Sequence, residues 1–165
     1  VIENIIDENN DKYECFIAND NSNGQIVLSG NLKDLEKMMI DLKAANIKNI
    51  KLPVSAPFHC KLMDKATSIM REKINNTNFK KPRNVIISNV TGSETQEIDK
   101  IKDLLIKQIE SPVRWRESVI YMIKNGVTNF IEIGPGKVLS GLIKRIDKTV
   151  KINTINKFED ISEIA

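Results

Sequence analysis

The chain has very few of the side chains that build metal sites and disulfide frameworks. It contains one histidine, His59, and two cysteines, Cys15 and Cys60, which lie far apart and form no Cys-x-x-Cys pair. A structural zinc site takes about four such ligands, and a disulfide framework takes several spaced cysteines. We therefore expect no metal and no cofactor, and the two free thiols favour a reducing, cytoplasmic setting.

Aromatic residues and long apolar runs are also scarce. Phe, Trp and Tyr make up 5% of the residues, and the net charge is only +3, with basic and acidic residues interspersed. Nucleic-acid binding needs aromatic stacking surfaces or a strongly basic face, so no nucleic acid is expected as a partner. No apolar run approaches the roughly 20 residues that span a bilayer, and the first residues show no signal-peptide pattern, so no membrane association is expected.

What remains is an ordinary globular composition. The 165 residues are 41% hydrophobic and 28% charged, which is enough for one core or for one domain with a small appendage. The chain opens with Val1-Ile2-Glu3 rather than with methionine, and its first residues resemble the end of an amphipathic helix that no strand precedes. We therefore expect the chain to be a piece of a longer protein.

Residues 1–52 are predicted to form most of a ferredoxin-like subdomain. Residues 14–18 and 25–29 have the pattern of short strands, and the turn-rich stretch 19–24 between them predicts an antiparallel hairpin. An apolar stripe at three- and four-residue steps predicts a helix over 32–45, and 49–54 is expected to be a strand. With the initial helix, these are five of the six elements of a βαββαβ unit, whose first strand would lie upstream of Val1.

Residues 53–165 alternate between helix and strand patterns. Helices are predicted over 62–74, 101–109, 119–125 and 138–146, and strands over 84–88, 129–133 and 150–155. The compact β-branched run at 84–88 is typical of a buried parallel strand. Strands separated by helices favour a mainly parallel sheet covered on both faces, so the predicted fold class is α/β.

The stretch Ser55-Ala-Pro-Phe-His-Cys60 holds the single histidine. His59 could be a catalytic base, a metal ligand or a packed ring, and the residue taken alone does not decide among these roles. Cys60 is poorly placed to act with it, because adjacent residues direct their side chains apart. The chain has no G-x-S-x-G nucleophile motif, so a serine activated by His59 would have to come from elsewhere.

Two further features are candidates for a site. Gln108 falls on the apolar edge of its predicted helix, where its amide either caps a carbonyl group or lines a cleft. Gly134-Pro-Gly136 lies between a predicted strand and a predicted helix, where backbone amides and Lys137 could bind an anion. This loop lacks the Walker and G-x-G-x-x-G spacings, so turn formation is the simpler explanation.

Five blocks of the sequence occur in the order and at the intervals found in one family. They are NDNSNGQIVLSG, LPVSAPFHCKLM, IISNVTG, KQIESPVRW and FIEIGPGKVLSGLIKR. Together they resemble the C-terminal half of the malonyl-CoA:acyl carrier protein transacylase family, whose blocks also occur in acyltransferase domains of polyketide and fatty acid synthases. The resemblance runs from about Cys15 to Asn156. The family's GQG-type loop, its GHSLGE-type serine motif and its malonyl-pairing arginine precede this region and are absent here.

The resemblance implies a fold and a set of site residues. The fold would be an α/β-hydrolase-like larger subdomain, with 53–165 as its C-terminal part, and a ferredoxin-like smaller subdomain, 1–52, inserted into it. His59 matches the family's general base, and the backbone carbonyl of Gln108 would orient it in place of an acidic third member. Asn19 and Asn21 match asparagines near the subdomain junction, where they either bind substrate or form turns.

The implied function is malonyl transfer from coenzyme A to acyl carrier protein in fatty acid biosynthesis, through a serine acyl-enzyme. Malonyl-CoA and the phosphopantetheine-bearing carrier protein would be substrates rather than cofactors. Lys61, Lys137 and Arg145 could form a basic rim for the acidic carrier protein. The chain alone would lack the serine and would be inactive without the N-terminal half of the same enzyme. The alternative is a non-catalytic module that binds a carrier protein or an acyl ligand.

Overall fold

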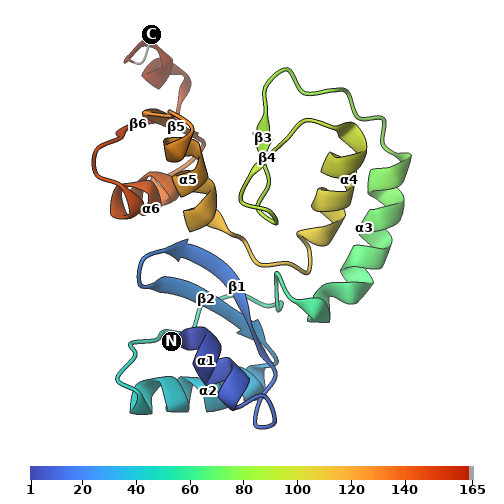
Figure 1. Ribbon diagram of the computed structural model, residues 1–165, viewed down its shortest axis with the longest axis vertical. Helices are drawn as coiled ribbons and strands as arrows, with labels where there is room; N and C mark the ends of the chain where they lie inside the picture. Colours follow the sequence, from blue (N-terminus) through green and yellow to red (C-terminus); the bar gives the residue numbers. More distant parts are fainter. Residues whose placement is uncertain (164–165) are drawn as a thin grey trace.

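The computed structural model describes residues 1–163. The N-terminal part contains α1 (Ile2–Glu8), β1 (Cys15–Ser22), β2 (Gln25–Gly30) and α2 (Leu32–Ala44). β1 and β2 form the expected antiparallel hairpin, in which Ser22 lies opposite Gln25. Figure 1 shows both helices on one side of this hairpin, and Met38 and Leu42 of α2 pack there with Cys15 in a buried cluster.

The hairpin turn is tighter than the sequence predicts. β1 continues to Ser22, so Asn23 and Gly24 alone separate the two strands. Gly24 has a φ of 75°, a conformation that glycine adopts without steric cost. The expected link over 19–24 was too long, because Asn19 and Asp20 pair with β2 despite their preference for turns. Backbone pairing here overrides local propensity.

The predicted strand over 49–54 is wrong for the part of the chain that the structure describes. These residues form no strand ladder within 1–163. The side chains of Ile50, Leu52 and Val54 are 74%, 42% and 63% exposed. An alternating apolar pattern produces a strand only where a neighbouring strand accepts its backbone hydrogen bonds, and none of residues 1–163 does so.

The middle of the chain is built on two helices that lie side by side in Figure 1. It contains η1 (Lys61–Met63), α3 (Asp64–Asn76), β3 (Ile86–Ile87), β4 (Glu94–Thr95) and α4 (Ile98–Lys107). The helices agree with the predicted patterns. The predicted buried parallel strand over 84–88 is wrong, because β3 has two residues, pairs antiparallel with β4 and leaves Ile86 41% exposed. A tight turn, in which the Gly92 amide donates to the Ser88 carbonyl at 2.9 Å, reverses the direction of the chain between β3 and β4.

The C-terminal part follows the sequence prediction closely. It contains α5 (Trp115–Lys124), β5 (Asn129–Ile133), α6 (Val138–Ile146), β6 (Lys151–Ile155) and η2 (Phe158–Glu163). β5 and β6 pair in parallel, as a strand-helix-strand crossover requires. Val119 of α5, Phe130 of β5 and Ile143 of α6 form the buried centre of this part. None of the helices among residues 1–163 combines the length and apolar character needed to cross a membrane.

Within residues 1–163 the strands form three two-stranded sheets, of which only β5–β6 is parallel. The expected mainly parallel sheet is therefore wrong for this part of the protein, because alternation of helices and strands predicts the elements but not their partners. One parallel bridge joins β1 to the segment before α5. The Asp20 amide donates to the Val113 carbonyl at 2.9 Å, and the Val113 amide donates to the Ala18 carbonyl at 2.8 Å. This bridge brings the hairpin next to the segment that begins at Gln108.

Candidate active site

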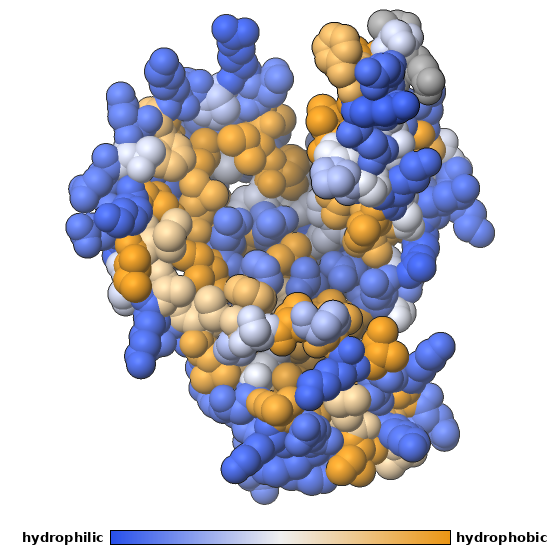
Figure 2. All heavy atoms as spheres, turned by 180° about the vertical axis from the view of Figure 1, so that it is seen from behind, coloured by the Kyte–Doolittle hydropathy of each residue, from blue (hydrophilic) through white to orange (hydrophobic). Residues whose placement is uncertain are grey.

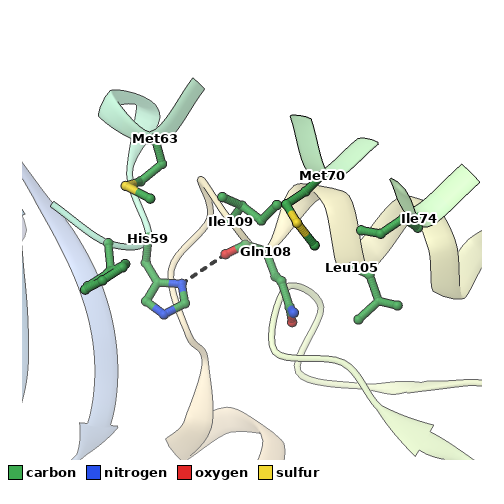
Figure 3. Close-up of a pocket in the computed structure, with 8 residues that line it drawn as sticks. His59, Met63, Met70, Ile74, Leu105, Gln108 and Ile109 are labelled. Atoms are coloured by element: carbon green, nitrogen blue, oxygen red, sulfur yellow. Dashed lines mark hydrogen bonds between the residues drawn. The ribbon is translucent and has the colours of Figure 1, made fainter. Parts of the chain in front are cut away.

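His59 lies in the loop between residues 49–54 and η1, and its backbone has a φ of 61°. Residues with a Cβ atom adopt this left-handed conformation rarely, and it often marks functional sites. The conformation follows from the loop, because the preceding Ser55-Ala-Pro57 favours extended backbone and Cys60 begins the turn into η1. The reversal at His59 turns its ring toward the end of α4 (Figure 3).

The imidazole of His59 contacts the backbone of Gln108. Its Nδ1 lies 2.9 Å from the Gln108 carbonyl oxygen. A carbonyl oxygen only accepts hydrogen bonds, so Nδ1 carries a proton and donates it, and Nε2 of the neutral ring is left with its lone pair. The geometry thus selects the tautomer in which Nε2 can act as a base.

The position of Gln108 at the end of α4 makes its carbonyl suited to this contact. Its amide donates to the Leu104 carbonyl at 2.9 Å, whereas its own carbonyl lies in the last turn, where no later helical amide reaches it. Carbonyl groups at a helix C-terminus carry partial negative charge and stabilise a nearby cation. The Gln108 carbonyl therefore orients the His59 ring.

A cavity of about 420 Å³ lies beside this pair. His59 and Gln108 contribute to its wall, and the rest is apolar: Phe58, Met63, Met70, Ile74, Leu105 and Ile109. Figure 3 shows that the labelled apolar side chains come from η1 (Met63), from α3 (Met70 and Ile74), and from α4 and the turn after it (Leu105 and Ile109). Of the two alternatives for Gln108, lining a cleft therefore describes its position. A single base at the wall of an apolar cavity can exchange a proton with a group bound there.

No protein-family model matches the chain. The malonyl CoA-acyl carrier protein transacylase of Bacillus subtilis is 42% identical over 146 residues, which are 88% of this chain and 46% of that protein. The crystal structure of a malonyl CoA-acyl carrier protein transacylase from Clostridium perfringens matches with a TM-score of 0.93 and 39% identity, covering 99% of this chain and 52% of the other. By both measures the chain is a homologue of malonyl CoA-acyl carrier protein transacylases.

These relatives confirm the family resemblance and its extent. The chain spans about half the length of the transacylases that it matches, and it corresponds to their C-terminal portion. A third structure, a malonyl-transacylase in complex with its type II polyketide acyl carrier protein, matches with a TM-score of 0.91 and 33% identity over 98% of this chain and 52% of that one. The similarity therefore extends over nearly all of the chain.

Unlike the His59–Gln108 pair, the asparagines predicted from the transacylase blocks lie outside the cavity wall. Asn19 and Asn21 are half-buried on β1, and Asn19 forms the bridge to Val113. Neither forms part of the hairpin turn. Asn19 is thus placed by its backbone at the junction between the hairpin and the segment that follows Gln108.

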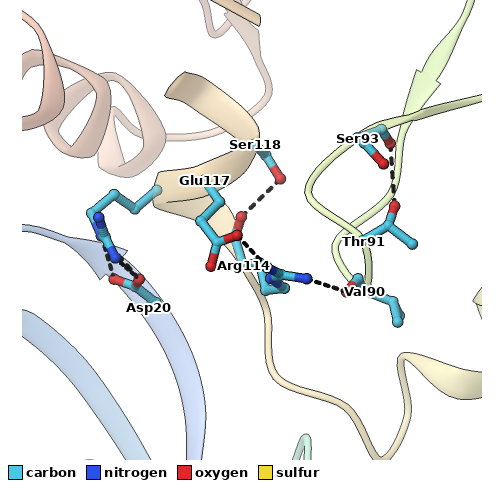
Figure 4. Close-up of polar contacts among 8 residues, drawn as sticks. Asp20, Val90, Thr91, Ser93, Arg114, Glu117 and Ser118 are labelled. Carbon is cyan, nitrogen blue, oxygen red and sulfur yellow. Dashed lines mark hydrogen bonds and ion pairs between the residues drawn. The ribbon is translucent and has the colours of Figure 1, made fainter. Parts of the chain in front are cut away.

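An ion pair at the same junction was missed by the sequence analysis. Arg116 of α5 donates from Nε to Asp20 Oδ1 at 3.0 Å and from Nη2 to Asp20 Oδ2 at 2.6 Å (Figure 4). These hydrogen bonds are the main cause of a raised pKa of Arg116. The two residues are 96 positions apart, and no spacing in the sequence connects them. The pair fastens the hairpin to α5.

The three residues of the predicted carrier-protein rim do not form one cluster. Lys61 pairs with Glu14, just before β1, whereas Arg145 donates to Gln25 at the turn end of the hairpin. These contacts place Lys61 and Arg145 at opposite ends of the hairpin. Lys137 is exposed before α6. Lys137 and Arg145 thus share the α6 region, and Lys61 lies apart from them.

The candidate anion site at Gly134-Pro-Gly136 is occupied by the chain itself. The carboxylate of Glu132 accepts hydrogen bonds from the Leu139 amide at 3.1 Å and the Ser140 amide at 2.7 Å, at the start of α6. Burial raises the pKa of Glu132, but the hydrogen bonds from Ser140 and Leu139 outweigh it and lower the pKa below the ordinary value. The Glu132 carboxylate is therefore the anion at the N-terminus of α6, and Gly134-Pro-Gly136 forms a turn.

Neither cysteine is placed as a nucleophile. Cys60 is 2% exposed, and its thiol donates to the Pro57 carbonyl at 3.2 Å, away from the contact that His59 makes. Burial, assisted by Asp34, raises the pKa of Cys15 to about 11. A thiol with so high a pKa forms little thiolate at neutral pH. Among residues 1–163 no three His, Cys, Asp or Glu side chains gather as metal ligands.

Proposed function

We propose that this chain is the C-terminal half of a malonyl-CoA:acyl carrier protein transacylase and supplies its general base, His59. The observation that supports this most strongly is the contact between His59 Nδ1 and the Gln108 carbonyl, which leaves Nε2 as a base at the wall of an apolar cavity. The relatives indicate which reaction the base would serve, since a protein that matches 88% of the chain is named a malonyl CoA-acyl carrier protein transacylase.

In the proposed first step, a serine in the preceding half attacks the thioester carbonyl of malonyl-CoA. His59 Nε2 takes the serine proton as the new C–O bond forms, and the imidazolium then gives this proton to the sulfur of coenzyme A as the C–S bond breaks. The product is a malonyl-serine ester. The Gln108 carbonyl stabilises the imidazolium during this step, which is the task of the acidic residue in a hydrolase triad.

The second step repeats the same proton transfers in the opposite direction. His59 Nε2 takes the proton of the phosphopantetheine thiol of an acyl carrier protein, whose sulfur attacks the ester carbonyl. The proton then returns to the serine oxygen as the ester C–O bond breaks. A carrier protein as acceptor is supported by the related malonyl-transacylase that is in complex with one.

The exposed apolar surface supports the proposal that another half of the protein covers this chain. Ile131 and Ile133 of β5 are 44% and 77% exposed, and Ile69 and Met70 of α3 are 64% and 43% exposed. Figure 2 shows apolar side chains gathered on the α3–α4 part of the molecule. We expect that half to complete an α/β-hydrolase-like subdomain with 53–165 and a ferredoxin-like one with 1–52, pairing a strand with residues 49–54.

The experiment is intact-mass measurement after incubation with malonyl-CoA. The complete enzyme, in which this chain follows its N-terminal half, is expected to gain one malonyl group, and the 165-residue chain alone is expected to gain none. A complete enzyme that binds carrier protein but forms no adduct would contradict the proposal and support a non-catalytic binding module instead. An adduct on the 165-residue chain alone would also contradict it, because the nucleophile would then lie in this half.

A further inference from the structure

Ser29 of β2 contacts the loop that carries His59. Its side chain is 7% exposed, and its hydroxyl donates to the carbonyl oxygen of Phe58 at 2.7 Å. This distance is typical of a well-formed hydrogen bond between a hydroxyl group and a carbonyl oxygen. Ser29 belongs to the hairpin, 29 positions before Phe58. The bond therefore ties the loop to a rigid strand rather than to its own neighbours.

The carbonyl that Ser29 holds restrains the backbone conformation of His59. The C=O of Phe58 and the N–H of His59 belong to one planar peptide unit, so fixing the carbonyl fixes the whole plane. The angle φ of His59 is the rotation about its N–Cα bond, which relates that plane to the rest of the residue. Its value of 61° is one that residues with a Cβ atom rarely keep unless the surroundings enforce it. A released plane would rotate toward negative φ and carry the His59 side chain with it.

Two other hydrogen bonds lie within this loop, and neither holds the Phe58 carbonyl. The Phe58 amide donates to the Ala56 carbonyl at 3.0 Å. The Cys60 thiol donates to the Pro57 carbonyl at 3.2 Å, and a thiol is a poorer donor than a hydroxyl. The contact of His59 with Gln108 is the result of the conformation, because the ring reaches the carbonyl at the end of α4 only when the loop holds it there. The restraint with the best geometry on the plane before His59 is thus the Ser29 hydroxyl.

We infer that Ser29 is a positioning residue for His59: its hydroxyl holds the Phe58–His59 peptide plane so that Nδ1 reaches the Gln108 carbonyl and Nε2 remains free as the base. The structural part of this inference concerns the tautomer and orientation of the His59 ring. Its kinetic consequence rests on the proposed function, since it requires His59 to be the base of an acyl transfer.

The test compares Ser29→Ala with a matched control in the complete enzyme. Ser118 of α5 is also buried, 3% exposed, and its hydroxyl donates to the Arg114 carbonyl at 2.8 Å (Figure 4). Ser118→Ala therefore removes a buried hydroxyl and a hydrogen bond of the same kind, at a place that does not touch the His59 loop. Ser29→Thr keeps the hydroxyl and serves as the conservative rescue.

Two readouts separate positioning from general stability. In ¹⁵N spectra of histidine-labelled protein, the ring signals of His59 are identified by their loss in His59→Gln. We expect the Nδ1–H tautomer in the parent, Ser118→Ala and Ser29→Thr proteins, and a tautomer mixture in Ser29→Ala. For malonyl transfer, Ser29→Ala is expected to lower kcat about tenfold with KM unchanged, because a misplaced base affects the chemical step rather than binding.

The inference is overturned if the His59 ring signals of Ser29→Ala match those of the parent, or if Ser118→Ala alters the ring and kcat as much as Ser29→Ala does. Should Ser29→Ala fail to fold, Ser29→Cys gives the same comparison with a side chain of similar size and a weak donor. The ring spectrum does not depend on turnover, so an inactive complete enzyme with an altered ring in Ser29→Ala would contradict the proposed function while supporting the role of Ser29.

Discussion

Residues 115–155 and residues 49–87 carry similar apolar side chains but bury them differently. In the first region Val119, Phe130 and Ile143 are at most 9% exposed, because α5 and α6 pack around the parallel β5–β6 pair. In the second region Ile50 is 74% and Ile86 is 41% exposed. The first region, which we call the self-contained region, closes a core of its own, although Ile131 and Ile133 on β5 stay exposed. The second region lacks such a core around Ile50 and Ile86. Burial therefore depends on the neighbours of a segment as much as on its own pattern.

The largest expected effect comes from making the same substitution in both regions. Ile143 is 4% exposed and Ile86 is 41% exposed. Ile143→Ala should lower the free energy of unfolding by about 2–5 kcal/mol through lost burial and a cavity, whereas Ile86→Ala should cost about 0.5 kcal/mol or less. Urea unfolding of the 165-residue chain measures both.

The same two substitutions can be made in the proposed complete enzyme. If the N-terminal half covers β3, Ile86→Ala should become several times more destabilising in the complete enzyme than in the 165-residue chain, and Ile143→Ala should cost the same in both. Equal costs for Ile86→Ala in the two proteins would show that the N-terminal half leaves β3 exposed.

The ion pair between Asp20 and Arg116 joins the hairpin to the self-contained region. Their side chains are 20% and 34% exposed, so solvent screens the pair only partly. A double-mutant cycle with Asp20→Asn and Arg116→Gln should give a coupling of about 0.5–1 kcal/mol. The control is the pair Asp103–Lys107 on α4, 50% and 58% exposed, for which about 0.3 kcal/mol is expected. A smaller coupling for Asp20–Arg116 than for the control would contradict a role of this pair in holding the hairpin.

Glu132 gives the self-contained region a dependence on pH. Its folded-state pKa is lowered, so the unfolded chain binds its proton more tightly than the folded chain. The stabilisation is therefore complete above the ordinary pKa of 4.5 and is lost as the pH falls through the lowered value. Glu132→Gln should destabilise the protein by about 0.5 kcal/mol at pH 7, as expected for a carboxylate at a helix N-terminus. A difference between the two proteins that stays constant from pH 7 to about pH 3 would contradict this account.

The smallest expected effect concerns the exposed charges on the self-contained region. Charge reversal at Lys137 or Arg145 should slow transfer to the carrier protein about two- to threefold, since exposed charges act mainly on association. Formation of the acyl-enzyme from malonyl-CoA should stay unchanged. Lys61→Glu is the control from the other end of the hairpin and should have a smaller effect. Equal losses in both half-reactions would rule out a rim that steers the carrier protein.

The sequence predicted best what local patterns determine. β5 was predicted over 129–133 and α6 over 138–146, and both bounds agree with the structure, because a strand-helix-strand unit supplies its own partners. The predicted strand over 49–54 failed because its pattern requires a neighbouring strand that residues 1–163 do not supply. In 84–88 only Ile86 and Ile87 pair, with β4. The turn over 19–24 was overestimated because pairing with β2 and Val113 prevailed over the turn preference of Asn19 and Asp20.

The site could be predicted only as far as the family resemblance reached. His59 and the Gln108 carbonyl were named from the matched blocks, and the structure places them 2.9 Å apart although they are 49 residues apart in sequence. The partner atom belongs to the backbone, so no residue pattern alone could have indicated it. The contacts of Ser29 with Phe58 and of Asp20 with Arg116 likewise depend on the tertiary arrangement. A single serine in a strand gives no sign of such a contact.

Replacing His59 with alanine in the proposed complete enzyme tests whether His59 is the base in both half-reactions. If His59 is the base in both steps, single-turnover rates of acyl-enzyme formation from malonyl-CoA and of transfer to acyl carrier protein should both fall by about 10²–10⁴-fold, the usual contribution of a general base. A loss confined to one half-reaction, or a change below about tenfold in both, would contradict the assignment of His59 as the base of acyl transfer.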